Sequence, residues 1–133
     1  MGSLDTNLLL RLFLGDVPDQ AEKIGNMLAA AKPNSFEVAD AVLFECVWVM
    51  SGPMYGLDRR IIADIMMQLT RIPQIKCNRA LIERVVPLYV RHPRLSFIDV
   101  CLVTCAEFSD ALPLLTYDKK LAKALPKLTK LVA

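Results

Sequence analysis

Histidine is almost absent from this chain, which has His92 alone, and its four cysteines form no CxxC pair. Zinc sites are usually built from several Cys and His ligands, and catalytic zinc sites commonly need two or three histidines. Cys101 and Cys105 lie one helical turn apart and could supply two zinc ligands. With His92 as the only histidine, the chain offers few residues to complete such a site. We therefore interpret the cysteines as reduced core residues of a cytosolic protein.

Long apolar runs are also absent. The longest uncharged stretch near the middle, residues 46–57, contains Pro53 and two glycines and falls short of the ~18 apolar residues that cross a bilayer. Asp5 lies where a secretory signal would be basic. We expect one cytoplasmic domain over residues 1–133, with no membrane partner. The hydrophobic content of 54% favours a protein partner or a second copy covering part of its surface.

Charge is unevenly distributed along the chain although the net charge is only +2. Residues 1–58 hold eight acidic and three basic side chains, whereas residues 59–133 hold six acidic and thirteen basic ones. Such a field suits a protein that binds a polyanion on one side and keeps an acidic centre on the other. A run of charge is more often a solvated face, so this pattern alone assigns no function.

Helical and strand patterns alternate along the chain. Apolar periodicity and caps predict helices over residues 6–14, 18–32, 41–50, 57–70, 79–90, 97–108 and 118–125. Short strands are expected before Asp5 and over residues 36–38, 75–77, 112–116 and 127–132. Residues 36–38 could instead be the lead-in to the next helix. Together they indicate an α/β domain with a mainly parallel sheet.

Three details of these helices are specific enough to test. Asp40 is expected to be the N-cap of helix 41–50. Helices 41–50 and 97–108 are apolar nearly all round, which predicts that both are buried. Helix 57–70 should direct one apolar face inward, formed by Ile61, Ile62, Ile65, Met66 and Leu69.

Four acidic residues stand out from the others. Glu45 is the only charge in residues 41–50 and Asp99 the only one in residues 95–106, and neither has a Lys or Arg three or four positions away. We expect both to be buried, so that each needs a distant cation or another compensating group. Asp5 and Asp118 adjoin predicted strand ends, where a helix-capping role is an equally good interpretation.

A shared site would explain all four carboxylates. The carboxyl ends of parallel strands meet at one edge of a sheet, which is where ligands bind in such folds. Oxygen ligands without histidine or thiolate suit Mg²⁺ or Mn²⁺. Such a metal activates water and neutralises phosphate, so phosphoryl chemistry needs no catalytic histidine.

The contexts of these acids resemble a known family. Leu4-Asp5-Thr6-Asn7, Glu45 in its apolar helix, Ser96-Phe97-Ile98-Asp99 and Leu115-Thr116-Tyr117-Asp118-Lys119-Lys120 together resemble the signature of PIN domains. They are similar in particular to the VapC-type toxins of bacterial and archaeal toxin–antitoxin systems. The resemblance runs from Asp5 to about Leu125. It implies a three-layer α/β/α sandwich around a parallel sheet, and RNA cleavage that depends on Mg²⁺ or Mn²⁺.

The resemblance also implies roles for residues and partners. The implied metal ligands, direct or through water, are Asp5, Glu45, Asp99 and Asp118. Asn7 and Thr116 match supporting polar positions, and Lys119 and Lys120 either contact substrate phosphates or form a solvated face. The implied partners are RNA, a small antitoxin protein and a second copy in a homodimer.

The chain departs from the family pattern in two places, and rival functions remain. Little chain precedes Asp5, so we expect a short first strand. Helix 57–70 and its preceding loop match no motif. Part of their surface forms a dimer or antitoxin interface, or else these residues are ordinary core: Met50, Met54, Tyr55, Met66 and Met67. The main rival is a catalytically inactive PIN-like module that binds RNA or protein. A phospho-accepting receiver domain would need adjacent acids after the first strand, which are not visible.

Overall fold

The computed structural model describes residues 2–132, so Met1 and Ala133, the ends of the predicted domain, lie outside it. The chain forms two compact units, an N-terminal unit over Met1–Arg79 and a C-terminal unit over Ala80–Ala133. Elements of the N-terminal unit are β1 (Gly2–Ser3), α1 (Thr6–Leu14), α2 (Pro18–Ala29), β2 (Phe36–Glu37), α3 (Asp40–Ser51), α4 (Arg59–Thr70) and β3 (Ile75–Lys76). Those that follow are α5 (Arg79–Arg91), α6 (Phe97–Phe108), β4 (Leu114–Thr116), α7 (Lys119–Ala124) and β5 (Thr129–Leu131).

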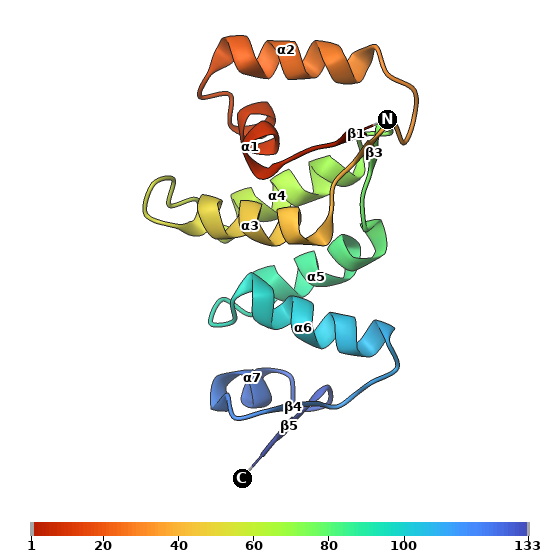
Figure 1. Cartoon of the computed structure of the whole chain (residues 1–133). Helices are drawn as coiled ribbons and strands as arrows, with labels where there is room; N and C mark the ends of the chain where they lie inside the picture. The colour runs from red at the N-terminus through yellow and green to blue at the C-terminus, as the bar shows by residue number, and fades with distance from the viewer. Residues whose placement is uncertain (1, 133) are drawn as a thin grey trace. The chain divides into compact units, whose positions relative to one another are not determined.

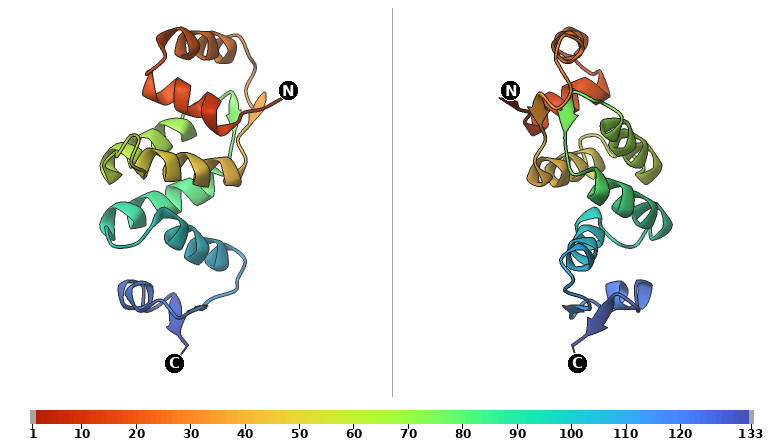
Figure 2. Two further views of the ribbon diagram at one scale, coloured as in Figure 1. Left: turned by 60° about the vertical axis from the view of Figure 1, so that its left-hand side comes forward. Right: turned by 90° about the vertical axis from the view of Figure 1, so that its right-hand side faces the viewer.

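A short parallel sheet organises the N-terminal unit, with strand order β1-β2-β3. The three strands lie side by side in Figure 2. Backbone bonds continue the pairing past the strand ends, because Leu4 N donates to Glu37 O at 2.9 Å and Val38 N donates to Lys76 O at 2.9 Å. The carboxyl ends of the strands therefore share one edge, and Asp5 follows β1 there.

Helices of the N-terminal unit bury their apolar sides against one another. In Figure 1, α1 lies beside α2, and α3 lies beside α4. The fully buried side chains include Leu9 of α1, Leu43 and Met50 of α3, and Ile62 and Leu69 of α4. Each fully buried side chain of this size stabilises the fold by about 1.5–3 kcal/mol.

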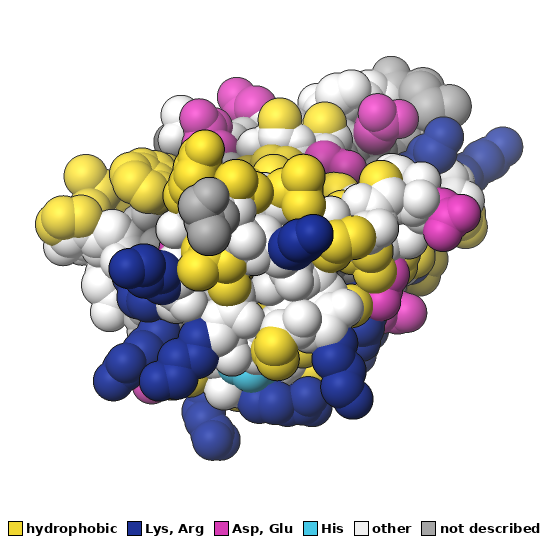
Figure 3. Space-filling model, turned by 90° about the horizontal axis from the view of Figure 1, so that it is seen from below, with side chains coloured by type: hydrophobic (Ala, Val, Ile, Leu, Met, Phe, Trp, Pro, Cys, Tyr) yellow, Lys and Arg dark blue, Asp and Glu magenta, His cyan; other side chains and the backbone are white. Residues whose placement is uncertain are grey.

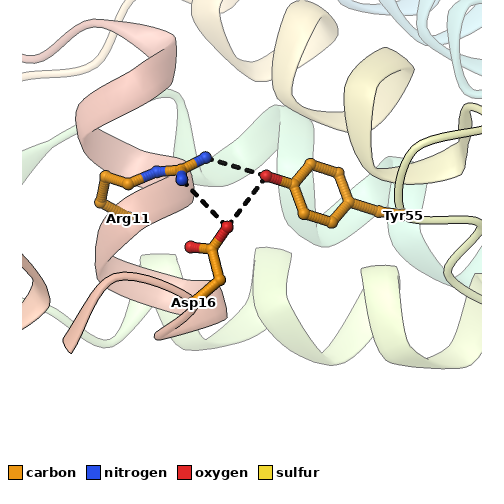
Figure 4. Close-up of polar contacts among 3 residues, drawn as sticks. All are labelled: Arg11, Asp16 and Tyr55. Carbon is orange, nitrogen blue, oxygen red and sulfur yellow. Dashed lines mark hydrogen bonds and ion pairs between the residues drawn. The ribbon is translucent and has the colours of Figure 1, made fainter.

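Arg11, Asp16 and Tyr55 join the end of α1 to the loop after α3 (Figure 4). Arg11 Nη1 pairs with Asp16 Oδ2 at 2.9 Å, and Arg11 Nη2 donates to Tyr55 Oη at 2.9 Å. Tyr55 Oη in turn donates to Asp16 Oδ2 at 3.1 Å. The hydroxyl of Tyr55 is therefore fixed by hydrogen bonds within the N-terminal unit.

The C-terminal unit contains a two-stranded parallel sheet, in which Leu114, Leu115 and Thr116 of β4 pair with Thr129, Lys130 and Leu131 of β5. Helix α7 connects the two strands and buries Leu121 beneath them. Val85 of α5 and Val100 of α6 are fully buried in the same unit.

Most predicted elements are present, with shifted ends. The helix predicted over residues 18–32 ends at Ala29, and the one predicted over 57–70 begins at Arg59 because Asp58 caps it, accepting from Arg60 N at 2.7 Å. The prediction that Asp40 is an N-cap is wrong: Ala39 occupies that position and Asp40 is the first residue of α3. The first strand is short, as expected.

Predicted faces agree less well than predicted elements. Ile61 was placed on the inward face of α4 but is 48% exposed. Helix α6 is not buried all round, because Ile98, Leu102 and Phe108 are exposed. Helices without a polar face give no signal of which side meets solvent, and over half of a folded protein's surface is apolar anyway.

The methionines of the unmatched segment divide between two environments. Met50 and Met66 are core residues, Met67 is partly exposed and Met54 is 81% exposed. Core packing therefore accounts for part of this set. Among residues 2–132, no helix has the length and apolar character needed to span a membrane.

Candidate functional site

Asp5 lies at the carboxyl edge of the N-terminal sheet and begins α1. It follows β1 and has the extended backbone of an N-cap, with φ −90° and ψ 174°. Its Oδ1 accepts a hydrogen bond from Leu8 N at 2.9 Å. A carboxylate at this position satisfies an amide that has no partner inside the helix. The capping interpretation of Asp5 is therefore correct, and its carboxylate is exposed.

Glu45 reaches the same corner of the N-terminal unit from α3. The hydroxyl of Thr6, the residue after Asp5, donates a hydrogen bond to Glu45 Oε1. Thr6 is only 8% exposed, so the contact is held by packing. Thr6 and Glu45 are 39 positions apart in the chain. The fold thus brings Asp5 and Glu45 together across one threonine.

The negative charges of Glu45 and Asp5 both affect the pKa of the nearby Cys46 thiol. The pKa of its thiol is raised from 9.0 to about 12, chiefly by burial and then by the charges of Glu45 and Asp5. Its Sγ lies 3.9 Å from Thr6 O as a weak donor. Since the thiolate is the reactive form, Cys46 is a packing residue and not a nucleophile.

Asp99 belongs to a capping box at the start of α6. Ser96 Oγ accepts from Asp99 N at 3.1 Å, while Asp99 Oδ2 accepts from Ser96 N at 3.2 Å. The reciprocal bonds satisfy two backbone amides at the helix start. They also fix the orientation of the Asp99 carboxylate.

Asp118 caps α7 directly after β4. Its Oδ1 accepts from Lys120 N at 2.9 Å and from Leu121 N at 3.1 Å. Thr116 Oγ1 accepts from Asp118 N at 2.9 Å. Thr116 therefore holds the backbone of the neighbouring acid. The capping interpretation of Asp118 is also correct.

The prediction that Glu45 and Asp99 are buried is wrong. Glu45 is exposed and Asp99 is partly exposed. Helix α3 buries Leu43, Cys46, Val47 and Met50, and Glu45 lies on another side. These carboxylates therefore avoid the large desolvation cost of buried charges.

The donor chemistry of the four acids suits a hard divalent cation. Each carboxylate has one oxygen engaged in the bonds described above, and its other oxygen has no hydrogen-bond partner among the described residues of its own unit. None of the four is paired with a Lys or Arg of that unit within residues 2–132. Free carboxylate oxygens are the ligands that Mg²⁺ and Mn²⁺ prefer.

The four acids divide between the two units. Asp5 and Glu45 belong to the N-terminal unit, while Asp99 and Asp118 belong to the C-terminal one. In the described part of either unit, no three Asp, Glu, His or Cys side chains form a metal-binding group. Binding of one metal by all four acids thus stays a prediction.

Other predicted residues lie at the surface. Asn7 is exposed and its side chain makes no hydrogen bond to the described residues of its unit, and Lys119 and Lys120 are exposed. Cys46 and Cys101 are buried as expected, but Cys105 is exposed and Cys77 partly so. The core interpretation of the cysteines therefore holds for two of them.

Sequence reasoning assigned no role to Thr6 or Ser96. The Ser-x-x-Asp spacing of residues 96–99 is a capping-box pattern and could have identified Ser96. No local signal predicts the Thr6–Glu45 bond, because its partners are distant in sequence. An open depression of about 410 Å³ at the ends of β2 and β3 was also unforeseen. Glu37, Lys76 and a hydrogen bond from Asn78 Nδ2 to Asp40 Oδ2 (3.2 Å) line it.

Comparison with known proteins identifies the fold. The family model described as PIN domain matches residues 3–125, whereas no curated protein sequence matches the chain significantly. That family's fold is a three-layer α/β/α sandwich. Together with the helices and parallel strands of residues 2–132, the match confirms the predicted fold class.

Proposed function

Because the chain belongs to the PIN-domain family, whose members are generally Mg²⁺- or Mn²⁺-dependent nucleases, we propose that it is an endoribonuclease hydrolysing RNA phosphodiester bonds. One observation carries the proposal. Four carboxylates in the family's order each have one oxygen held by a backbone amide or a hydroxyl, with the second oxygen free of partners in its unit. Such carboxylates are oriented before any ligand arrives.

In this proposal Asp5, Glu45, Asp99 and Asp118 hold the metal. The bound cation would lower the pKa of a water and neutralise phosphate charge. The protein's own residues supply orientation: Thr6 positions Glu45, Ser96 positions Asp99, and Thr116 holds the backbone of Asp118. Asn7 is proposed as a further polar support.

Lys119 and Lys120 are proposed to contact substrate phosphates. Both are exposed, and they directly follow the proposed ligand Asp118. Neither forms an ion pair with a described residue of its unit. Lysines so placed attract a phosphate backbone without reading its sequence.

The family resemblance supports a more specific biological role. We propose a VapC-type toxin that acts in the cytoplasm as a homodimer, is inhibited by a small antitoxin, and forms one nuclease domain over residues 1–133. Expression of the wild type should arrest growth, and co-expression of the proposed small antitoxin should relieve the arrest. Unimpaired growth under strong expression would contradict the toxin role.

RNA cleavage with Mg²⁺ or Mn²⁺ tests the enzymatic proposal. Wild type should cut RNA, and Asp5→Asn and Asp99→Asn should both be inactive, because asparagine keeps the caps but removes the ligand charge. Asp64→Asn is the matched control, since Asp64 is an exposed acid of α4 outside the proposed set. Equal activity in all four proteins would overturn the proposal.

A second candidate is a PIN-like module that binds RNA or protein without cutting. One observation favours it: Asp5, Asp99 and Asp118 all satisfy backbone amides at helix starts, and this structural role alone would preserve them in an inactive domain. Calorimetry with Mn²⁺ separates the candidates. Metal binding that Asp5→Asn weakens favours the nuclease, and no heat at millimolar metal favours the module.

A further inference from the structure

Two aromatic side chains are far more exposed than the rest. The chain has nine aromatic residues, and Trp48 is 78% exposed and Tyr117 81% exposed. Each lies within three positions of a proposed metal ligand: Trp48 follows Glu45, and Tyr117 precedes Asp118. Large aromatic residues are usually well buried because burial removes much apolar area from water.

Trp48 projects from the same side of α3 as Glu45. Positions three apart on a helix are neighbours on its surface, and Glu45 and Trp48 are both exposed. The indole makes no hydrogen bond to the described residues of its unit. Its flat face is thus available to a ligand one helical turn from the carboxylate.

Tyr117 lies between β4 and α7 in a basic surrounding. The exposed residues Lys119 and Lys120 follow it, and Lys130 of β5 pairs in register with Leu115 of β4. Apart from these residues, Figure 3 shows several Lys and Arg side chains along the lower edge of the face that it draws. Lysine charge beside an exposed ring is complementary to a nucleic acid, which has phosphates and flat bases.

We propose that Trp48 and Tyr117 each stack on an unpaired base of the RNA. The inference rests on the proposed function, because it takes RNA as the substrate. Stacking on an aromatic face suits unpaired bases, since a base in a duplex is already covered by its neighbours. Trp48 and Tyr117 are then substrate-positioning residues, and they favour cleavage in single-stranded segments.

The fluorescence of Trp48 tests the proposal without a label, because it is the chain's only tryptophan. Single-stranded RNA is titrated into the wild type in EDTA, so that nothing is cut. We expect quenching of Trp48 emission and protection from iodide. An oligomer of equal length with abasic sites has the same phosphates and should produce neither effect.

Substitutions give a second measurement. Trp48→Leu and Tyr117→Leu should each weaken RNA binding roughly 5- to 150-fold, whereas Trp48→Phe and Tyr117→Phe should retain most of it. Phe108→Leu is the matched control, an exposed aromatic residue of α6 that lies nine positions from Asp99 and ten from Asp118. Because the exchanged side chains are exposed, circular dichroism should show unchanged folding.

Each outcome separates this inference from the proposed nuclease activity. RNA cleavage that is unchanged in both leucine variants, with equal quenching by abasic RNA, would overturn the stacking and leave the nuclease intact. Base-dependent quenching in a protein that cuts no RNA would support the stacking and remove the nuclease. Iodide protection of Trp48 that rises with protein concentration, without RNA, would show a second copy on this surface and overturn the assignment of Trp48.

Discussion

Replacing Asp5 separates two roles that one carboxylate is proposed to fill. Its Oδ1 caps α1 through Leu8 N at 2.9 Å, and the whole carboxylate is proposed to hold a metal. Asparagine caps a helix about as well as aspartate, because its amide oxygen accepts the same bond. Alanine cannot accept it. Asp5→Asn should therefore remove only the ligand, and Asp5→Ala should remove both functions.

The expected magnitudes follow from these contacts. Loss of an N-cap costs typically about 1 kcal/mol, in the range of roughly 0.5–2. For a chain of this length that lowers Tm by about 3–5 °C. Asp5→Ala should show this loss, and Asp5→Asn should stay within about 0.5 kcal/mol of wild type. RNA cleavage should fall at least about 100-fold in both, because even residues behind a ligand contribute 10- to 100-fold.

Thermal unfolding in EDTA measures the cap alone, and RNA cleavage with Mn²⁺ measures the ligand. Asp64→Asn serves as the control in both assays. Equal destabilisation by asparagine and alanine would show that the Leu8 bond is not what Asp5 contributes to stability. Full cleavage activity in Asp5→Asn would refute the ligand role while leaving the cap unaffected.

Further predictions concern Thr6, Cys46 and the Arg84–Glu107 pair. Thr6→Val should lower the free energy of unfolding by about 1 kcal/mol, because Glu45 loses its donor, whereas Thr6→Ser should lose less; urea unfolding measures both. Cys46, with a pKa raised to about 12, should resist iodoacetamide at pH 8 while exposed Cys105 is alkylated, which mass spectrometry detects. Because the unfolded thiol ionises near 9.0, the stabilising effect of keeping Cys46 protonated is complete below pH 9 and should be lost as the pH rises towards 12. Arg84 donates two hydrogen bonds to Glu107, of 2.8 and 3.1 Å, and these bonds are the main cause that lowers the pKa of Glu107. The stability that this pair contributes should therefore be lost as the pH falls through the lowered pKa. Glu107→Gln should lower the free energy of unfolding by less than about 1 kcal/mol, and by less in high salt.

Local signals predicted the elements well because their causes are local. Gly15 ends α1 with φ 62°, a conformation that glycine adopts without strain. Asp118 could be expected to cap a helix from its position alone. The motifs around the four acids also identified the family, which the match over residues 3–125 confirms.

Orientation and distant contacts could not be predicted in the same way. Helices α3 and α6 are apolar on most sides, so their sequences do not indicate that Glu45 and Leu102 face solvent. The bond from Thr6 to Glu45 depends on how α1 packs against α3, and no pattern within either helix encodes it. The argument from buried charge failed for this reason, whereas the resemblance, which depends on residue order, is confirmed at the level of the PIN-domain family.

Capping offers a physical reason why Asp5, Asp99 and Asp118 have no cationic partner among the described residues of their own unit. A backbone amide at a helix start carries partial positive charge, and a carboxylate there is stabilised by the helix dipole. Asp5 and Asp118 lie at N-caps and Asp99 in a first turn, so each is stabilised on one oxygen by its own helix. A lysine partner would neutralise the carboxylate and compete with any metal, but an amide stabilises the charge and leaves the second oxygen available. In the proposed site, the contacts that begin α1, α6 and α7 therefore orient three of the four acids and leave each of them one oxygen for the cation.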